Sequence, residues 1–147
     1  MNLKRLGFKI LNPTVNILLR SPLHFIASKR IMAIEYTGVK SGKNFSVPVS
    51  YFKKDGFIYC LTDGLWWNNF SVERQVDLIL NKKKRVSQAK VVTNDAIFID
   101  VLSSLIKKFP SDARYYGVQL DDDKQPRLGQ LELAKKNNKM IRFTVCG

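Results

Sequence analysis

Two alternating runs of residues joined by a glycine-containing turn constrain the fold of this chain more than any other feature. Met32, Ile34 and Tyr36 alternate with small or polar residues, which is the spacing of a strand with one buried face. The same spacing recurs over residues 45–51, and the segment Gly38–Lys43 between the runs has the composition of a turn. We therefore expect two antiparallel strands connected by this turn.

A proline inside the second run limits where that strand can lie. Pro48 has no N–H to donate, so its strand is expected at a sheet edge, or bulged where something other than a strand lies beside it. Asp55-Gly56 is typical of a hairpin turn and leads into a third alternating run over residues 57–61. We expect the three strands to form an antiparallel meander.

The second half of the chain predicts further strands and two helices. Strands are expected near residues 76–80 and 86–92, joined by a lysine-rich hairpin over 81–85. Thr93 or Asn94 can cap a following helix. The apolar face of that helix consists of Ile97, Phe98, Val101, Leu102, Leu105 and Ile106.

A short helix near residues 127–136 and a strand over 140–145 complete the predicted elements. Five or six antiparallel strands with peripheral helices indicate an α+β protein built on a small β-barrel. The length of 147 residues fits a single domain over residues 1–147. Within it we expect an N-terminal helical segment over 1–30, with a helix start at Ser21-Pro22, and the barrel core with its helices over 31–147.

The charge of the chain favours acidic partners. It has 25 Lys and Arg residues against 12 Asp and Glu residues, a formal net charge of +13. Phosphorylated ligands, anionic lipid and nucleic acid all fit such a balance, and an ordinary lysine-rich surface is the alternative. The basic segment 1–19 can pack on the domain or contact an anionic membrane, and we favour packing.

The cysteine and histidine content points to a reducing compartment without a metal centre. Cys60 and Cys146 are too few for a disulfide framework, and no signal peptide is evident, so we expect a cytoplasmic protein. His24 is the one histidine of the chain, and with two distant cysteines it cannot complete a tetrahedral zinc set.

The turn at residues 38–43 is the strongest candidate for a binding site. A turn of this kind presents backbone N–H groups, and Lys40 and Lys43 place two ammonium groups beside them, which suits a phosphate. Trp66 and Trp67 downstream offer flat apolar surface for a ring system. Together they suggest a site for a phosphorylated, planar cofactor. The alternatives are a solvated hairpin loop and tryptophans that pack in the core or as a lid.

Four motifs in order resemble the deazaflavin-dependent nitroreductase family, small split β-barrels related to the flavin-binding barrels. They are Ser-Pro-Leu-His at 21–24, Tyr-Thr-Gly-x-Lys-Ser-Gly-Lys at 36–43, Val-Pro-Val-x-Tyr at 47–51 and Trp-Trp-x-Asn at 66–69. The resemblance extends over about residues 16–92 and implies an α+β fold, a small antiparallel split β-barrel with peripheral helices. Many relatives carry an arginine where this chain has Val39. The valine cannot make the bidentate phosphate contact that an arginine makes at this position.

What the resemblance implies for function is an oxidoreductase. Its hydride donor would be the reduced 8-hydroxy-5-deazaflavin coenzyme (factor-420), and its acceptor a small quinone-like or nitroaromatic molecule; barrels of this type often pair as homodimers. The implied cofactor-binding residues are Lys40, Ser41, Gly42 and Lys43 in the turn, Pro48, Val49 and Ser50 in the next strand, and Thr62, Asp63, Trp66, Trp67 and Asn69 after the third strand.

A proton donor is needed if the acceptor becomes an anion on reduction. Tyr115 and Tyr116 are the candidate catalytic residues because phenolic O–H groups can donate to a reduced quinone or nitro group. The alternative, that both tyrosines are structural, is favoured slightly by their position outside the matching motifs.

Two other functions stay open on the sequence. One is a split barrel that binds flavin mononucleotide, and the other is a non-enzymatic basic barrel that binds nucleic acid or lipid head groups. A nucleic-acid barrel interleaves exposed aromatic residues with lysines along its strands. Here the strand aromatics alternate like core residues, which disfavours nucleic acid; they are Phe45, Tyr51, Phe57 and Tyr59.

Overall fold

The computed structural model of the protein describes residues 30–146. The N-terminal segment expected to be helical therefore lies outside the described residues except for Arg30, as do Ser21-Pro22, His24 and the basic stretch considered for membrane contact. None of the helices in the described part of the chain has the length and apolar character needed to cross a membrane.

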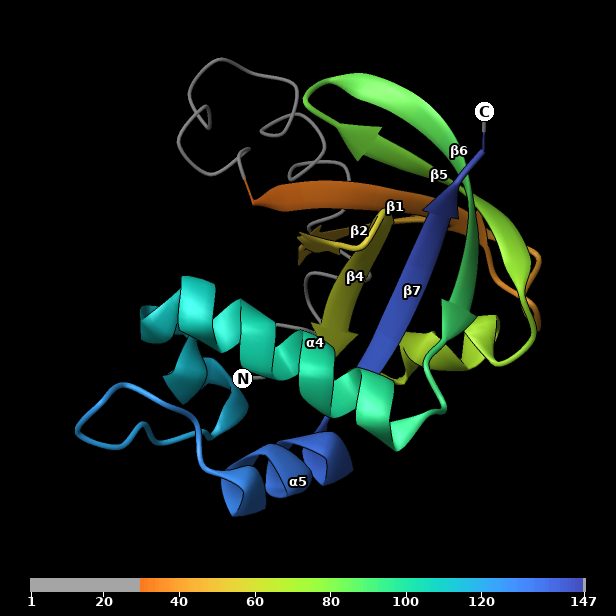
Figure 1. Ribbon diagram of the computed structural model, residues 1–147. Coiled ribbons are helices and arrows are strands. Elements are labelled where there is room, and N and C mark those ends of the chain that lie inside the picture. The colour runs from red at the N-terminus through yellow and green to blue at the C-terminus, as the bar shows by residue number, and fades with distance from the viewer. Residues whose placement is uncertain (1–29, 147) are drawn as a thin grey trace, which may run out of the picture. The chain divides into compact units, whose positions relative to one another are not determined.

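The described residues form two compact units (Figure 1). The first extends to Val91 and resumes at Ile141, and it contains one seven-stranded sheet and a short 3-10 helix, η2 (Leu65–Phe70). The second, Val92–Met140, contains α4 (Asp95–Lys108), the 3-10 helix η3 (Pro110–Tyr116) and α5 (Leu128–Asn137). The strands are β1 (Ile31–Thr37), β2 (Asn44–Ser50), β3 (Phe52–Lys54), β4 (Phe57–Thr62), β5 (Arg74–Leu80), β6 (Lys83–Val91) and β7 (Lys139–Val145).

The sheet confirms the predicted hairpin but not the predicted meander. β1 and β2 pair antiparallel along their whole length, from Ile31 opposite Ser50 to Thr37 opposite Asn44. The strand order is β2-β1-β5-β6-β7-β4-β3, so β2 and β4 are not hydrogen-bonded neighbours and the meander of three strands is wrong. The chain leaves the sheet at Tyr51, whose N–H donates to the Arg30 carbonyl, and β3 starts a separate hairpin with β4.

Pro48 explains why β2 has a single partner among the described strands. It lies opposite Ala33 of β1, and it has no N–H to offer a strand on its other side. β2 accordingly stands at the end of the sheet order, which confirms the predicted edge position.

The sheet curls so that one face encloses the core, forming an antiparallel half-barrel (Figure 1). Alternate residues of β1, β5, β6 and β7 point inward, and Ile34, Leu78 and Phe143 are completely buried there. The α+β prediction is confirmed. The hairpin between β5 and β6 is also confirmed, but its turn is shorter than the predicted 81–85 and consists of Asn81 and Lys82, both at positive φ (49° and 68°), as a tight turn between twisted strands requires. β6 begins directly after this turn, at Lys83.

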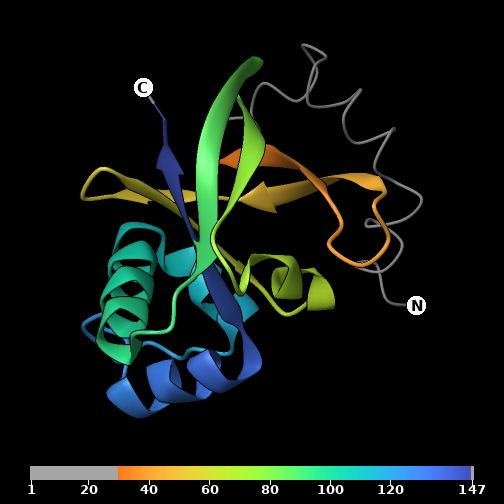
Figure 2. The same ribbon diagram turned by 90° about the vertical axis from the view of Figure 1, so that its right-hand side faces the viewer.

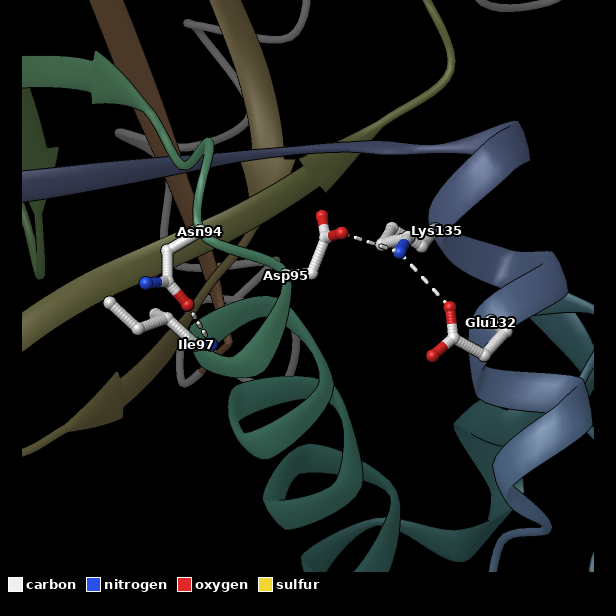
Figure 3. Close-up of polar contacts among 5 residues, drawn as sticks. All are labelled: Asn94, Asp95, Ile97, Glu132 and Lys135. Atoms are coloured by element: carbon white, nitrogen blue, oxygen red, sulfur yellow. Dashed lines mark hydrogen bonds and ion pairs between the residues drawn. The ribbon is translucent and has the colours of Figure 1, made fainter.

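The helical unit confirms the predicted cap and apolar face of α4. The Asn94 Oδ1 atom accepts a hydrogen bond from the Ile97 N–H at 3.0 Å, which satisfies one of the free donors at the helix start (Figure 3). Of the predicted apolar face, all but the half-buried Ile97 are buried. Lys135 of α5 lies 3.0 Å from both Asp95 and Glu132, so it connects α5 to the first turn of α4 (Figure 3). The hydrogen bond to Asp95 raises the pKa of Lys135.

Candidate cofactor-binding site

The turn between β1 and β2 is closed by its own hydrogen bonds. The Gly38 N–H donates to the Lys43 carbonyl at 2.8 Å, and the Gly42 N–H donates to the Gly38 carbonyl at 3.0 Å. The Lys43 N–H donates to Ser41 Oγ at 3.2 Å. Gly42 has φ +67°, in the left-handed region where glycine carries no steric penalty. The turn is therefore an ordered loop rather than a loose connection.

Two backbone donors of this turn are left for a ligand. The Val39 N–H donates to Asn69 Oδ1 at 2.9 Å, so four of the six residues Gly38–Lys43 have an engaged N–H. Those of Lys40 and Ser41 have no acceptor among the described residues. The turn also contains the exposed side chains of Lys40 and Lys43. The sequence suggested several unpaired backbone N–H groups in this turn, and the structure leaves two adjacent ones, which suits a single phosphate group.

Asn69 joins the turn to the tryptophan helix. Its Oδ1 accepts from Val39, and its Nδ2 donates to the Trp66 carbonyl at 2.8 Å. One side chain thus connects segments 30 residues apart in the sequence. In Figure 2 the turn between β1 and β2 (orange) lies beside η2 (yellow-green). The predicted phosphate holder and the predicted ring stacker are therefore neighbours.

The two tryptophans of η2 are half-buried, intermediate between the core and lid roles left open by the sequence. The Trp66 ring is stacked on Tyr36 with centroids 6.3 Å apart and planes 27° apart, and it meets Phe70 edge-on at 6.0 Å. Phe70 is fully buried and meets Tyr36 edge-on at 5.2 Å. Trp67 packs against the same core. These contacts hold η2 on the barrel while part of each indole stays accessible.

The other implied cofactor-binding residues lie in the same unit with differing roles. Thr62 is buried, and its Oγ1 accepts the Gly64 N–H at 3.0 Å, which shapes the entry to η2. On β2, Pro48 is half-buried, Val49 packs against the core from a half-buried position, and Ser50 is exposed. Asp63 is exposed. Thr62 and Asn69 therefore act on the shape of the site, whereas the turn and the indoles offer surface to a ligand.

Tyr115 and Tyr116 belong to the helical unit, at the end of η3. Tyr115 is exposed, and the Arg114 guanidinium lies 5.5 Å from the centre of its ring. Tyr116 is half-buried. Their role as proton donors stays a prediction.

Tyr36 and Arg74 are polar residues of the barrel that sequence reasoning missed. The Tyr36 hydroxyl and the Arg74 Nη1 atom are buried and have no hydrogen-bond partner in the described structure. Burial raises the pKa of Tyr36, and the positive charge of Arg74 partly opposes that rise. Arg74 carried a signal in the sequence, because it shares the two-residue spacing of Val76 and Leu78 and so falls on the buried face of its strand.

A groove of about 450 Å³ lies in the helical unit. It is lined by Asp95, Ala96, Ile99, Asp100, Ser103, Leu128 and Glu132. This lining has three carboxylates and no lysine or arginine, so the groove lacks the positive charge that favours a phosphate and does not compete with the turn as a phosphate site.

The sequence matches no protein-family model and no curated protein sequence. Solved structures, in contrast, share the fold. The chain is similar to an F420-H2-dependent reductase (18% identity, 78% of this chain and 94% of that chain, TM-score 0.51). It is also similar to the heme storage protein HutZ of Vibrio cholerae (10% identity, 93% and 91%, TM-score 0.53). A third is an FAD- and heme-binding protein of Mycobacterium smegmatis (10% identity, 86% and 67%, TM-score 0.51).

These likenesses confirm the predicted fold class. The sheet is an antiparallel split β-barrel with helices, and the structural neighbours include barrels described as reductases and as flavin- or heme-binding proteins. At 10–18% identity the likeness is one of fold, so the function must be argued from the site itself.

Proposed function

We propose that the protein is an oxidoreductase that binds a phosphorylated flavin-type cofactor at the turn between β1 and β2 and at η2. The observation that carries the proposal is the pair of free backbone donors at Lys40 and Ser41, flanked by two lysines and tied through Asn69 to half-exposed tryptophans. The resemblance of the motifs favours the deazaflavin coenzyme factor-420, with flavin mononucleotide as the alternative. The similar barrels that act on F420-H2 or bind FAD support this class of cofactor.

The residues present fit such a cofactor. The backbone donors of Lys40 and Ser41, with the ammonium groups of Lys40 and Lys43, would hold a phosphate, and the indoles of Trp66 and Trp67 would hold the ring. A flavin or deazaflavin supplies hydride transfer when bound. The chain contributes position, because a ring fixed at contact distance from an acceptor reacts without any protein nucleophile.

The acceptor in this proposal is a small quinone-like or nitroaromatic molecule, with Tyr115 and Tyr116 as proposed proton donors.

The proposal also keeps a cytoplasmic location and a homodimer as hypotheses, the latter supported by a structural neighbour described as a domain-swapped dimer. Peripheral contact of the basic N-terminus with a membrane stays a hypothesis too. Deletion of residues 1–14 should abolish binding to anionic vesicles if that contact exists.

Cofactor binding should be saturable and should depend on Lys40. We expect purified protein to bind either the deazaflavin coenzyme or flavin mononucleotide with quenching of the fluorescence of its two tryptophans. Lys40→Ala should weaken the better ligand about fivefold, the equivalent of ~1 kcal/mol for an exposed charge contact. Lys82→Ala is the matched control, because it removes an exposed lysine from the turn between β5 and β6 and should leave the affinity unchanged.

Equal losses in both variants would mean that the net positive charge, and not the turn, attracts the ligand. Failure to bind either cofactor would refute the oxidoreductase proposal and favour the non-enzymatic basic barrel. A steep loss of nucleic-acid binding with salt would then identify a polyanion as the partner.

Asn69 should act specifically on the phosphate end of the cofactor. Asn69→Leu removes the hydrogen bond that ties the turn to η2 and a second one within η2, so we expect flavin mononucleotide to bind about tenfold more weakly, consistent with the loss of two hydrogen bonds. Riboflavin, which lacks the phosphate, should bind with unchanged affinity. Titrations of each variant with both ligands measure the difference.

The neighbouring Asn68 provides the control. It makes the same kind of hydrogen bond within η2, from Nδ2 to the Leu65 carbonyl at 2.9 Å, and the structure gives it no bond to the turn. Asn68→Leu should leave the ratio of the two affinities unchanged. If Asn69→Leu weakens riboflavin as much as flavin mononucleotide, Asn69 positions the ring pocket and not the phosphate turn.

A further inference from the structure

Three buried polar atoms on the inner face of the barrel have no hydrogen-bond partner in the described structure. They are Tyr36 Oη, Arg74 Nη1 and Ser87 Oγ. Tyr36 and Ser87 are 5% and 0% exposed, respectively, so bulk water does not reach them. A buried polar group without a partner is costly, and in a native protein it commonly marks a bound water, ion or ligand.

The strand register places the three residues around Val76. Glu35 pairs with Asp77, so the next residue, Tyr36, lies beside Val76, and Val76 pairs with Ser87 on its other side. Arg74 precedes Val76 by two residues and therefore shares its face of β5. Arg74 is thus a diagonal neighbour of both Tyr36 and Ser87, a separation of about 7–8 Å that long side chains can bridge.

Among the described strands, the residues next to these three on the inner face carry no negative charge. Arg74 pairs across β5 and β6 with Ala89, and Val76 lies between Tyr36 and Ser87, so the adjacent side chains on this face are apolar. Trp66 and Phe70 pack on Tyr36 and cover this end of the barrel. Arg74 can only donate, and both hydroxyl groups are free to donate as well. The missing partner is therefore an acceptor, and the guanidinium favours one with negative charge.

We propose that Tyr36, Arg74 and Ser87 form an oxyanion-binding site on the inner face of the barrel, beneath Trp66 and Phe70. The ligand is a carboxylate or a similarly small oxyanion that accepts from the guanidinium and from the two hydroxyl groups. The site uses residues other than those of the turn at Gly38–Lys43, and anion binding to it needs no cofactor. Its further role rests on the proposed oxidoreductase function: the same donors would stabilise the negative charge that develops on an acceptor oxygen during reduction.

Titration calorimetry with the full chain tests the site in the absence of any cofactor. Formate and benzoate are the probes, at constant ionic strength set with chloride, and nitrate serves as the inorganic oxyanion. We expect saturable binding that weakens at least tenfold in Arg74→Gln, since a charged hydrogen-bond donor is lost. Tyr36→Phe and Ser87→Ala should each weaken binding about three- to tenfold.

Arg85→Gln is the matched control. It removes the same charge from the same β5–β6 hairpin at an exposed position, and it should not change the affinity. Benzoate binding tighter than formate would identify an organic carboxylate as the ligand class, whereas nitrate and formate binding without benzoate would identify a free small oxyanion. Absence of saturable binding, or equal losses in Arg74→Gln and Arg85→Gln, would overturn the proposal.

Thermal unfolding provides a second readout that does not depend on measuring weak heats. Without an added anion, Arg74→Gln should unfold at the same or a higher temperature than the original chain, because it removes a half-buried charge whose Nη1 atom has no hydrogen-bond partner in the described structure. Formate or benzoate should raise the unfolding temperature of the original chain and of Arg85→Gln, but not that of Arg74→Gln. In Tyr36→Phe, the anion should raise the unfolding temperature by less than in the original chain. This second variant tests the proposal even if Arg74→Gln fails to fold. An equal rise in all variants would contradict it.

Discussion

Replacing Phe70 with alanine is expected to destabilise the barrel unit by about 3–5 kcal/mol, the usual cost of truncating a buried phenylalanine. Phe70 is fully buried, and its ring meets both Tyr36 and Trp66 edge-on. Alanine would leave a cavity under η2, and the edge-to-face contacts would be lost with it. The same change should abolish the tryptophan quenching by cofactor, because Trp66 loses the ring that holds it in place.

Guanidinium denaturation followed by tryptophan fluorescence measures this effect directly, since the barrel unit contains both tryptophans of the chain. Val72→Ala is the control: Val72 lies two residues beyond Phe70 and is 74% exposed, so its truncation should change the free energy of unfolding by less than ~0.5 kcal/mol. A loss below ~1 kcal/mol in Phe70→Ala would show that η2 does not pack on the core as described.

Leu102→Ala is expected to destabilise the helical unit by about 2–5 kcal/mol. Leu102 is fully buried in the middle of α4, on the face that also contains Phe98 and Ile106. Loss of its side chain removes the favourable free energy of burying that side chain and leaves a cavity. α4 cannot easily move to close the cavity, because Lys135 of α5 holds its first turn. Circular dichroism at the helix band measures the unfolding of this unit, because the unit contains α4 and α5. Tryptophan fluorescence does not follow it directly, because residues 92–140 include no tryptophan.

Leu128→Ala is the matched control, because it makes the same truncation at a 64% exposed position of α5 and should cost less than ~0.5 kcal/mol. Comparison of the two signals also tests the single-domain hypothesis. If the tryptophan transition shifts together with the helix transition in Leu102→Ala, the units unfold as one cooperative structure; if only the helix transition shifts, they unfold separately. Equal effects at Leu102 and Leu128 would contradict the described burial.

The sequence predicted features that depend on local periodicity and local capping. The alternation around Ile34 indicated β1, Asp55-Gly56 indicated the turn that leads into β4, and Asn94 indicated the start of α4, because each of these signals lies within a few residues of the element it controls. The position of Pro48 at a sheet edge was also predictable, since a missing donor is a property of the residue itself.

What could not be predicted depends on pairing between distant segments. The insertion of β5, β6 and β7 between β1 and β4 follows from how the whole sheet closes, and no local pattern encodes it. The same applies to the candidate site. Motif resemblance selected the turn and the tryptophans, but only the folded chain shows that Asn69 connects them and that Arg74 Nη1 has no hydrogen-bond partner in the described structure.

The two ends of the sheet affect how the protein behaves at high concentration. Among the described strands, one end is β2 with Pro48, and the other is β3, only three residues long and containing Lys53 and Lys54. Prolines, charged residues and very short strands are devices that prevent an exposed strand from pairing with another molecule. Crowded or newly synthesised copies of this chain are thus hindered from joining strand to strand into growing fibres, and a closed dimer would form through side-chain surfaces rather than through a continuous sheet.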